Sequence, residues 1–420
     1  MQPIRGTKDI LPQEIKHWQT IYTNVKRILS QHNYKEIRTP IIENTELFAR
    51  SIGDFTDIVN KEMYTFSDQG KRKITLRPEG TASVARAFIS NRLYLNNPIN
   101  RLWYLGPMFR YERPQKGRQR QFHQLGIECI GSILPLADVE VIRLATKILE
   151  NINFKDWILQ INSIGNVEER KIYIEKLLKY LYRYKDDLDN DSQTRLHDNP
   201  LRILDSKNLK TQEILIESPK LINYLGKESI IHFETICNQL NHLNIDYKIN
   251  TNLVRGLDYY NYTAFEIITN TNDKQNTICG GGRYDELIQQ LGGPHTPSVG
   301  WAMGIERLIM NLNDNIFTQE KIKTIYIINS ELNESSTLWK IINIIDKYNI
   351  NFEIDLSNKN IKKQLRRANK LGIHVCFIIK NNEISSEYIT VKWMRTHVQQ
   401  QIQLCQLDNY LKYLKNHLKA

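Results

Sequence analysis

Leu102-Trp-Tyr-Leu-Gly-Pro-Met-Phe-Arg-Tyr111 and Phe122-His-Gln-Leu-Gly-Ile-Glu-Cys-Ile130 are two β-strand patterns on either side of a basic loop. In the second pattern, period-two alternation places Gln124, Gly126 and Glu128 on one face and apolar residues on the other. Polar groups on one face of a central strand need partners, because burying them unpaired costs free energy. The pattern therefore predicts a β-sheet whose polar face forms the floor of a pocket.

The segments before these strands predict a helix and an edge strand. Apolar side chains recur at helical spacing over residues 14–32, and Pro12 stands where a helix start tolerates proline. Residues 36–43 follow as one short strand interrupted by Pro40, which indicates a sheet edge or a bulge. A long amphipathic helix followed by such a strand also predicts a subunit contact.

The later parts of the chain separate by pattern. The chain has 420 residues, a length typical of two or three domains. Residues 166–245 are polar and rich in Lys and Tyr, which predicts a helical insertion, and strands resume at 246–269. From residue 323 the pattern predicts a separate α/β domain. Its expected strands are 325–328, 352–354 and 375–379, its helices 334–348 and 358–371, and a hairpin at 388–404 precedes a last helix from 406.

Composition excludes several classes of protein. No apolar run is long enough to cross a bilayer, and the N-terminus has no secretory signal, so we expect a cytoplasmic protein without a membrane partner. The five cysteines lie far apart and form no CxxC pair, which argues against a disulfide framework or a structural zinc site. The formal net charge of +11 is weak support for a polyanionic partner.

Arg255-Gly-Leu-Asp-Tyr-Tyr-Asn261 has too many polar positions for a core strand. As an extended segment, it would place Arg255, Leu257 and Tyr259 on one face and the intervening residues on the other. A surface hairpin edge is the alternative for this stretch taken alone.

Three further polar clusters each allow two interpretations. Glu79 and Thr81 offer a carboxylate and a hydroxyl to a ligand, or they cap a helix. Arg110 and the basic loop after it form an anion site or a solvated hairpin tip. Arg307 follows glycines in an apolar segment, where it binds a ligand or extends to solvent from a core helix.

The glycine-rich motifs point away from the common phosphate-binding loops. Residues 279–285, Cys-Gly-Gly-Gly-Arg-Tyr-Asp, lack the lysine of a P-loop and suit close approach of the backbone to a ligand. Separated arginines on a sheet neutralise a triphosphate through charge-assisted hydrogen bonds. The chain thus offers nucleotide-binding chemistry without a P-loop.

In this order along the chain, the segments resemble the histidyl-tRNA synthetase family of class II aminoacyl-tRNA synthetases. The resemblance covers nearly the whole chain and rests on the Pro40 strand, the 109–124 strand–loop–strand, residues 255–260, residues 280–285 and residues 304–308. It implies an α/β fold of the α+β type, with a mixed, mostly antiparallel six-stranded sheet and flanking helices. The implied organisation is a catalytic core at 1–165 and 246–322, a helical insertion at 166–245, and an anticodon-binding domain at 323–420.

The resemblance also implies the reaction. The carboxylate of L-histidine attacks the α-phosphate of ATP, pyrophosphate leaves, and the terminal adenosine hydroxyl of tRNA(His) takes the histidyl group. Arg110 and Arg255 are the implied catalytic residues, one on each side of the α-phosphate, and Mg²⁺ accompanies ATP without a dedicated protein metal site. The implied ATP-binding residues are Arg110, Glu112, Arg118, Arg120, Phe122 and Arg307.

The implied histidine site has two ends. Glu79, Thr81 and Gln124 hold the ammonium group, and Glu128, Tyr259 and Tyr260 surround the imidazole. With these, the implied histidine-binding residues are Glu79, Gly80, Thr81, Arg110, Gln124, Glu128, Arg255, Tyr259 and Tyr260. Asp258 receives no role.

The partners implied are a second copy of the chain, in a homodimer, and tRNA. The motif loop at 112–120 would reach the acceptor end, the insertion would clamp the acceptor stem, and the C-terminal domain would read the anticodon. Its Lys362, Lys363, Arg366 and Arg367 contact phosphates or form an exposed helix face. The rival functions are a catalytically inactive histidine-sensing regulatory paralogue and an RNA-binding module without activity.

Overall fold

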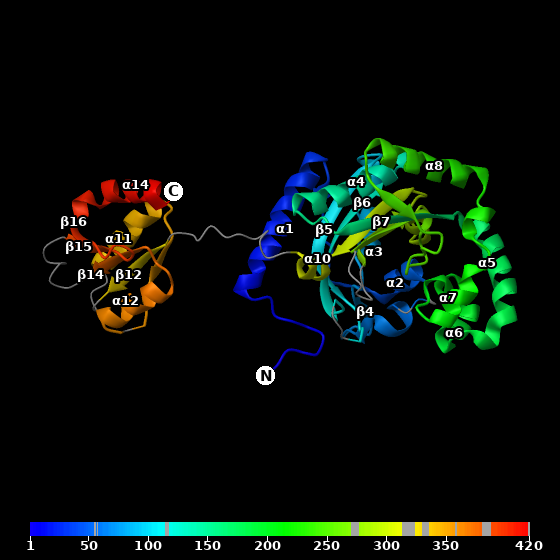
Figure 1. Ribbon diagram of the computed structural model, residues 1–420, viewed down its shortest axis with the longest axis horizontal. Helices are drawn as coiled ribbons and strands as arrows, with labels where there is room; N and C mark the ends of the chain where they lie inside the picture. Colours follow the sequence, from blue (N-terminus) through cyan, green and yellow to red (C-terminus); the bar gives the residue numbers. More distant parts are fainter. Residues whose placement is uncertain are drawn as a thin grey trace. The chain divides into compact units, whose positions relative to one another are not determined.

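The computed structural model describes residues 1–53, 56, 58–113, 117–269, 277–312, 324–329, 336–357, 359–379 and 388–418. The chain divides into two compact units, Met1–Phe317 and Thr318–Ala420. Figure 1 shows the elements of each unit, coloured along the sequence. No described helix is both long enough and apolar enough to cross a membrane.

An eight-stranded sheet organises the first unit. Its order is β1-β5-β6-β11-β10-β9-β7-β8, in which the six inner strands pair antiparallel and the two edge strands pair parallel with their neighbours. The strands are β1 (Lys35–Glu36), β5 (Asn100–Phe109), β6 (Gln121–Ile130), β7 (Trp157–Gly165), β8 (Tyr247–Ile249), β9 (Asn261–Thr269), β10 (Thr277–Arg283) and β11 (Ser298–Gly304). The count of six strands that the resemblance implied is wrong, because the short strands β1 and β8 add to the sheet at its two edges.

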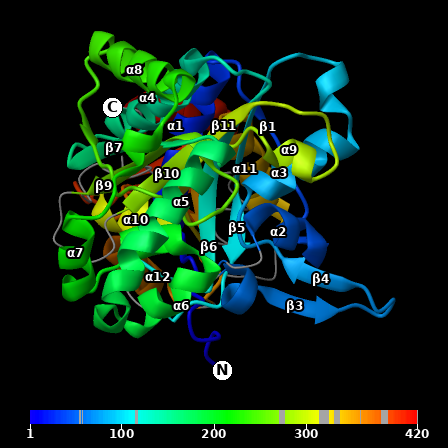
Figure 2. The same ribbon diagram turned by 90° about the vertical axis from the view of Figure 1, so that its right-hand side faces the viewer.

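A separate three-stranded antiparallel sheet, in the order β2-β4-β3, contains β2 (Ile42–Asn44), β3 (Tyr64–Ser67) and β4 (Lys73–Leu76). Strands β3 and β4 form a hairpin that projects from the rest of the unit (Figure 2). The single strand predicted at 36–43 is wrong. Pro40 lies between β1 and β2, which belong to different sheets.

Three helices cover one face of the large sheet. Helices α1 (Pro12–Gln31), α4 (Pro135–Asn151) and α8 (Lys227–His242) share one hydrophobic core with the sheet. Leu125, Ile127 and Cys129 of β6 belong to that core, so the alternation predicted for this strand is confirmed. The opposite face of β6, with Gln124 and Glu128, is left for the site.

The remaining helices of the unit border that opposite face, except α10 (Ile305–Asn311), whose Ile305 and Leu308 join the core with α1, α4 and α8. The shorter ones are α2 (Thr45–Ile52), α3 (Thr81–Ser90), α9 (Leu287–Gln290) and α10, with helical turns at Ile58–Glu62 and Leu93–Leu95. The segment between β7 and β8 is helical, as predicted. It consists of α5 (Val167–Leu181), η3 (Tyr182–Asp187), α6 (Asn190–Asp198), η4 (Pro200–Asp205), α7 (Leu209–Ile216), η5 (Leu221–Tyr224) and α8. Within the unit, α5, α6 and α7 lie together on the side away from α1 (Figure 1).

The second unit is a five-stranded sheet in the order β13-β12-β14-β15-β16. Its core elements confirm the predicted β-α-β-α-β pattern, hairpin and last helix. They are β12 (Ile325–Asn329), α11 (Ser336–Lys347), β13 (Phe352–Ile354), α12 (Ile361–Lys370), β14 (Val375–Ile379), β15 (Tyr388–Trp393), β16 (Gln399–Gln403), η7 (Leu404–Gln406) and α14 (Leu407–Leu418).

A buried ion pair ties β10 to α4. The Arg283 guanidinium is fully buried and donates to both Asp138 and Asp285. Burial alone would raise the pKa of Asp138, but Arg283 and His232 beside it lower the pKa below its ordinary value. Arg283, which stands in the glycine-rich motif, is therefore a structural residue and takes no part in a ligand site.

This ion pair gives a prediction for stability. Asp138→Ala leaves the Arg283 charge buried with one carboxylate fewer, so we expect a loss of about 3–5 kcal/mol in the free energy of unfolding. Glu46→Ala is the matched control. It removes the exposed Arg50–Glu46 pair and should cost less than about 1 kcal/mol. Chemical denaturation of both variants measures the difference, and equal losses would contradict a structural role for the buried pair.

Candidate active site

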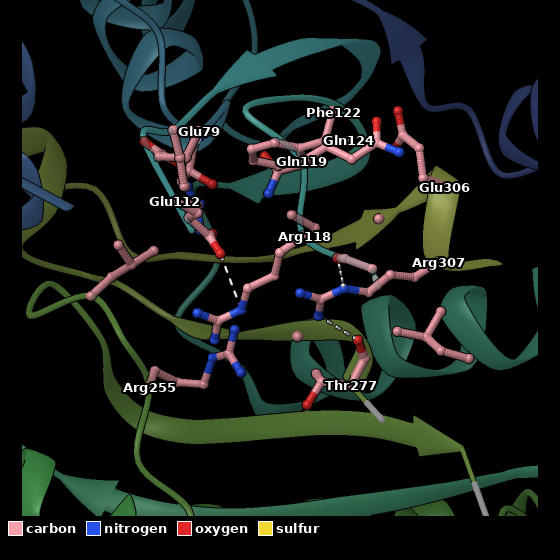
Figure 3. Close-up of a pocket in the computed structure, with 18 of the residues that line it drawn as sticks. Glu79, Glu112, Arg118, Gln119, Phe122, Gln124, Arg255, Thr277, Glu306 and Arg307 are labelled. Atoms are coloured by element: carbon pink, nitrogen blue, oxygen red, sulfur yellow. Dashed lines mark hydrogen bonds and ion pairs between the residues drawn. The ribbon is translucent and has the colours of Figure 1, made fainter. Parts of the chain in front are cut away.

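The polar face of the large sheet carries a cavity. Strands β6, β10 and β11, the start of α3, the loop 255–260 and the loop after β5 all contribute to it. The guanidinium groups of Arg118, Arg255 and Arg307 point toward the same space (Figure 3). The lining residues are Glu79, Thr81, Arg110, Glu112, Gly117, Arg118, Gln119, Phe122, Gln124, Arg255, Leu257, Tyr259, Tyr260, Thr277, Ile278, Gly280, Ala302, Gly304, Glu306 and Arg307.

Glu79 both caps a helix and lines the cavity. Its two carboxylate oxygens accept hydrogen bonds from the backbone N–H groups of Thr81 and Ala82, each at 2.7 Å, at the start of α3. Burial raises the pKa of Glu79, while these backbone donors lower it in part. The two interpretations of this segment are therefore compatible. Gly80 is the N-cap residue of α3 and is not part of the cavity lining.

Glu128 lies beneath the cavity lining in the middle of β6. Its side chain has no solvent exposure, and it accepts hydrogen bonds from Thr81 Oγ1 at 2.8 Å and from the Tyr284 hydroxyl. Burial raises the pKa of Glu128 to about 8. Gly300 is its neighbour on β11, and a Cβ there would lie 1.9 Å from Glu128 Oε2. A glycine at this register position is therefore required for the carboxyl group to fit.

Gln124 and the two tyrosines complete this end of the cavity. Within the described part of the chain, the buried Oε1 of Gln124 has no hydrogen-bond partner, so it is available to a donor on a ligand. Tyr259 and Tyr260 are both almost fully buried, with ring centroids 4.7 Å apart. An amine and a flat heterocycle would find acceptors, donors and aromatic faces here.

The extended conformation expected for 255–260 is wrong. These residues form a bend and a turn before β9, so Tyr259 and Tyr260 both face the cavity instead of alternating. Sequence periodicity could not reveal the turn, because it is held by groups distant in sequence.

Arg255 is held at the back of the cavity by β9 and β10. Its guanidinium forms an ion pair with Glu266, which also accepts a hydrogen bond from Thr277 Oγ1 at 3.1 Å. A Cβ at Gly280 would lie 2.3 Å from Arg255 Nη2. The glycine of strand β10 thus makes room for the Arg255 side chain. We had expected the glycine-rich backbone to approach the ligand instead.

Arg110, Arg118 and their partners form a second cationic wall. Arg110 Nε donates to the Pro78 carbonyl at 2.9 Å, and its guanidinium lies 5.2 Å from the ring centroid of Phe122. Arg118 is paired with Glu112 at 3.0 Å, a dashed line in Figure 3. The aromatic face of Phe122 and the guanidinium groups are therefore neighbours, an arrangement that suits a base attached to phosphates.

Arg307 occupies the far end of the cavity. Its guanidinium donates to the carbonyls of Gly117 and Thr277, both at 2.9 Å, so the side chain is fixed and does not extend to solvent as the alternative required. Burial lowers the pKa of Arg307, although a guanidinium stays protonated at neutral pH. The result is a preorganised cation for an anionic group.

The basic loop contributes less than expected. Arg120 is outside the cavity lining, and its guanidinium stacks over the ring of Tyr111, 3.9 Å from the centroid. Arg113 is also outside the lining, and Lys116 is outside the described residues. Among the described residues, no group of three or more His, Cys, Asp and Glu side chains is arranged to hold a metal ion.

Two residues that position the site were missed by sequence reasoning. Tyr284 holds Glu128, and it stands in the Gly-Gly-Gly-Arg-Tyr-Asp motif, so a signal existed. Glu266 holds Arg255 from β9, and its position as the single charged residue of that strand was the available signal. Neither pairing is visible in the local pattern, because each joins different strands or loops.

The cavity therefore has a cationic side and a hydrogen-bonding side. Arg110, Arg118, Arg255 and Arg307 would neutralise several phosphate charges, and the developing charge of a phosphoryl-transfer transition state would lie among them. Glu79, Gln124 and Glu128 would accept hydrogen bonds from a cationic or N–H-bearing ligand. Such a pair of subsites suits activation of an amine-bearing acid by a nucleotide.

Comparisons with known proteins agree with this chemistry. The sequence model of the family described as histidyl-tRNA synthetase matches residues 6–308, and that of the anticodon binding domain matches residues 309–415. The chain is 60% identical to the chloroplastic histidine–tRNA ligase of Gracilaria tenuistipitata var. liui, over 98% of this chain and 97% of that protein. It is 47% identical to the histidine–tRNA ligase of Acaryochloris marina, over 100% and 98% of the two chains.

A solved structure is also similar to this chain in sequence and fold. The apo histidyl-tRNA synthetase of S. aureus is 36% identical, with a TM-score of 0.79, and the match covers 98% of this chain and 100% of that chain. The fold, the cavity and these full-length matches lead to one conclusion. The chain belongs to the histidyl-tRNA synthetase family.

Proposed function

We propose that the chain is a histidine–tRNA ligase that forms histidyl-adenylate in the cavity described above. The new bond joins a carboxylate oxygen of L-histidine to the α-phosphorus of ATP, and the bond to pyrophosphate breaks. The terminal adenosine hydroxyl of tRNA(His) then attacks the activated carbonyl, and AMP leaves. The observation that carries the proposal is the convergence of four arginines with Glu79 and Gln124 in one cavity, with Glu128 beneath its lining and hydrogen-bonded to Thr81.

On the nucleotide side, Phe122 stacks on adenine and Glu112 hydrogen-bonds near it. Arg110 and Arg255 approach the α-phosphate from the two walls, and Arg307 binds the γ-phosphate. Mg²⁺ enters with ATP as part of the substrate. Arg118 replaces Arg120 as the assisting arginine, because Arg118 lines the cavity and Arg120 stacks on Tyr111.

On the amino-acid side, Glu79, Thr81 and Gln124 hold the ammonium group, and Glu128 with Tyr260 holds the imidazole nitrogens. A carboxyl group and a phenol can each donate or accept a hydrogen bond. The pair therefore fits either tautomer of a neutral imidazole. Gly80 contributes the helix start that positions Glu79 and Thr81. A site that hydrogen-bonds both nitrogens rejects amino acids lacking them by a wide margin.

For the tRNA, we propose that the loop 112–120 reaches the acceptor end, that residues 166–245 hold the acceptor stem, and that residues 323–420 read the anticodon. The match of the anticodon-binding model to residues 309–415 supports the last assignment. Lys362, Lys363, Arg366 and Arg367 are exposed together on α12, where phosphates would reach them. The catalytic core would comprise 1–165 and 246–322.

We also propose a homodimer. Ile41, Ile42 and Phe66 are more than two-fifths exposed on and beside the three-stranded sheet. A second apolar group, Ile133, Leu134 and Leu136, is exposed before and at the start of α4. Such patches mark protein contacts when they are contiguous, and a second copy of the chain is the partner that the family implies.

The compartment stays a proposal too. The relative from Gracilaria is named chloroplastic, whereas the relative from Acaryochloris marina is bacterial. We therefore propose that the chain works where organellar or bacterial translation takes place.

Histidine-dependent exchange of labelled pyrophosphate into ATP tests the proposal. We expect clear exchange with histidine and little with other amino acids, because the cavity supplies both subsites. An inactive histidine-sensing paralogue would bind histidine without exchange, and an RNA-binding module would do neither. Absence of exchange by well-folded chain at saturating histidine and ATP would sink the enzyme function.

Arg255→Ala separates chemistry from binding. Removal of one preorganised donor at the α-phosphate should lower the rate of adenylate formation about 10²–10³-fold. Histidine affinity, measured by calorimetry without ATP, should change less than about threefold. Arg50→Ala, on an exposed helix surface, is the control and should match the wild type in both assays. Equal losses of rate and affinity in Arg255→Ala would assign Arg255 a structural role instead.

The buried carboxyl group gives a pH dependence. Because the pKa of Glu128 is raised to about 8, the folded chain keeps a proton that the unfolded chain releases above the ordinary value of 4.5. Stability is thus lost as the pH rises toward about 8. Glu128→Gln cannot titrate, so its unfolding free energy relative to the wild type should increase between about pH 5 and about pH 8. Urea denaturation measures this difference, and a constant difference would contradict a protonated Glu128.

A further inference from the structure

Asp258, a charged residue of the 255–261 motif without a role in the proposed chemistry, lies where three segments meet. Its Oδ1 accepts a hydrogen bond from Asn199 Nδ2 at 2.9 Å, across 59 positions of sequence. Asn199 ends α6 and begins η4 in the helical insertion. The side chain of Asp258 is therefore turned away from the active-site cavity and toward the insertion.

The catalytic core approaches Asp258 from its other side. The Asp258 N–H donates to the Ile52 carbonyl at the end of α2, at 3.1 Å. Gly53 follows with a φ of 101°, and a Cβ there would lie 2.3 Å from Asp258 Oδ2. Glycine at this position serves both the backbone turn and the close approach of Asp258. The carboxylate is thus held between α2 and the insertion.

Two arginines of the insertion bind the same loop through its backbone. Arg202 of η4 donates to the Gly256 carbonyl, and Arg170 of α5 donates to the Tyr260 carbonyl. Gly256 is adjacent to Arg255, and Tyr260 carries the phenol proposed for the imidazole. The insertion therefore contacts the loop at positions 256, 258 and 260, and each contact involves a charged group.

The loop itself separates two cavities. Arg255, Leu257 and Tyr260 line the active-site cavity on one side and a second cavity, bordered by α5 and η4, on the other. Residues 255–257 of this bend-and-turn segment are only partly buried and Asp258 is exposed, whereas Tyr259 and Tyr260 are packed in a hydrophobic core. The polar contacts with the insertion restrain this loop in addition to the Arg255–Glu266 ion pair and the packing of the two tyrosines.

We propose that Asp258 and Asn199 are positioning residues that fasten the helical insertion to the loop 255–260, so that the placement of the insertion sets the geometry of the histidine and ATP subsites. The inference rests on the proposed function, in which this loop supplies Arg255 and Tyr260. It adds that the insertion is part of amino-acid activation even when no tRNA is bound. The insertion would also transmit the binding of an acceptor stem to the active site through the same contact.

A charge-swap experiment tests the contact in pyrophosphate exchange without tRNA. Asn199→Asp places a second carboxylate against that of Asp258 and removes their hydrogen bond. The KM for histidine should rise about 10-fold or more, which is the scale of one lost hydrogen bond to a charged group. The double variant Asn199→Asp, Asp258→Asn restores an amide–carboxylate pair with reversed polarity and should return KM to within about threefold of the wild type. Asp187→Asn changes an exposed ion pair with Lys210 in the same insertion and should leave KM unchanged.

The outcomes separate the two proposals. Wild-type chain without exchange would overturn the proposed function itself. Wild-type exchange together with a wild-type KM in Asn199→Asp would overturn only the positioning role. So would a double variant that folds with the thermal midpoint of the wild type but stays as impaired as the single one. If Asn199→Asp does not fold, Asn199→Ala takes its place, and a KM within about 1.5-fold of the wild type would overturn the role.

Discussion

Glu128 is a carboxyl group without solvent exposure, in a strand that is paired on both sides. Burial of such a group costs several kcal/mol unless it is protonated or hydrogen-bonded, and here both conditions are met. Thr81 at the start of α3 and Tyr284 after β10 donate to its two oxygens, and Gly300 leaves the space that the carboxyl group fills. One polar residue thereby fixes the positions of a helix start, a loop and a strand register around the cavity floor.

On the opposite wall of the cavity, buried cations take the place of the buried carboxyl group, and they too are held by protein partners. Without Glu266, Arg255 would be an unpaired buried cation. Gly280 on β10 leaves space for the Arg255 guanidinium, because a Cβ at that position would collide with it. Arg307 is held by two carbonyls and Arg110 by a third. Holding cations before the substrate arrives avoids reorganisation during the reaction, which is the main physical source of phosphoryl-transfer catalysis. The cavity therefore combines two preorganised halves that recognise different parts of one reaction.

The sequence predicts those parts of the fold that depend on a local pattern of residues. It does not predict the parts that are held by contacts between residues distant in the chain. The alternation of β6 was predictable, because a strand paired on both sides has two faces of different character. The β-α-β-α-β order of the second unit was predictable because short apolar runs alternate there with amphipathic helical segments. The turn at 255–260 was not, because it is held by Asn199, Arg202 and Ile52, all more than 50 positions away. The six-stranded sheet implied by the resemblance omitted β1 and β8, edge strands of two and three residues that are too short to show a periodicity of their own.

The central claim is that one cavity binds histidine and ATP together, with Glu128 under the imidazole and the arginines around the phosphates. A crystal structure of the chain with histidine and a non-hydrolysable ATP analogue tests it most directly. The structure of the complex should place an imidazole nitrogen within hydrogen-bond distance of Glu128 and the α-phosphate within reach of both Arg110 and Arg255. An imidazole elsewhere in the cavity, or a nucleotide that contacts neither arginine, would contradict the claim.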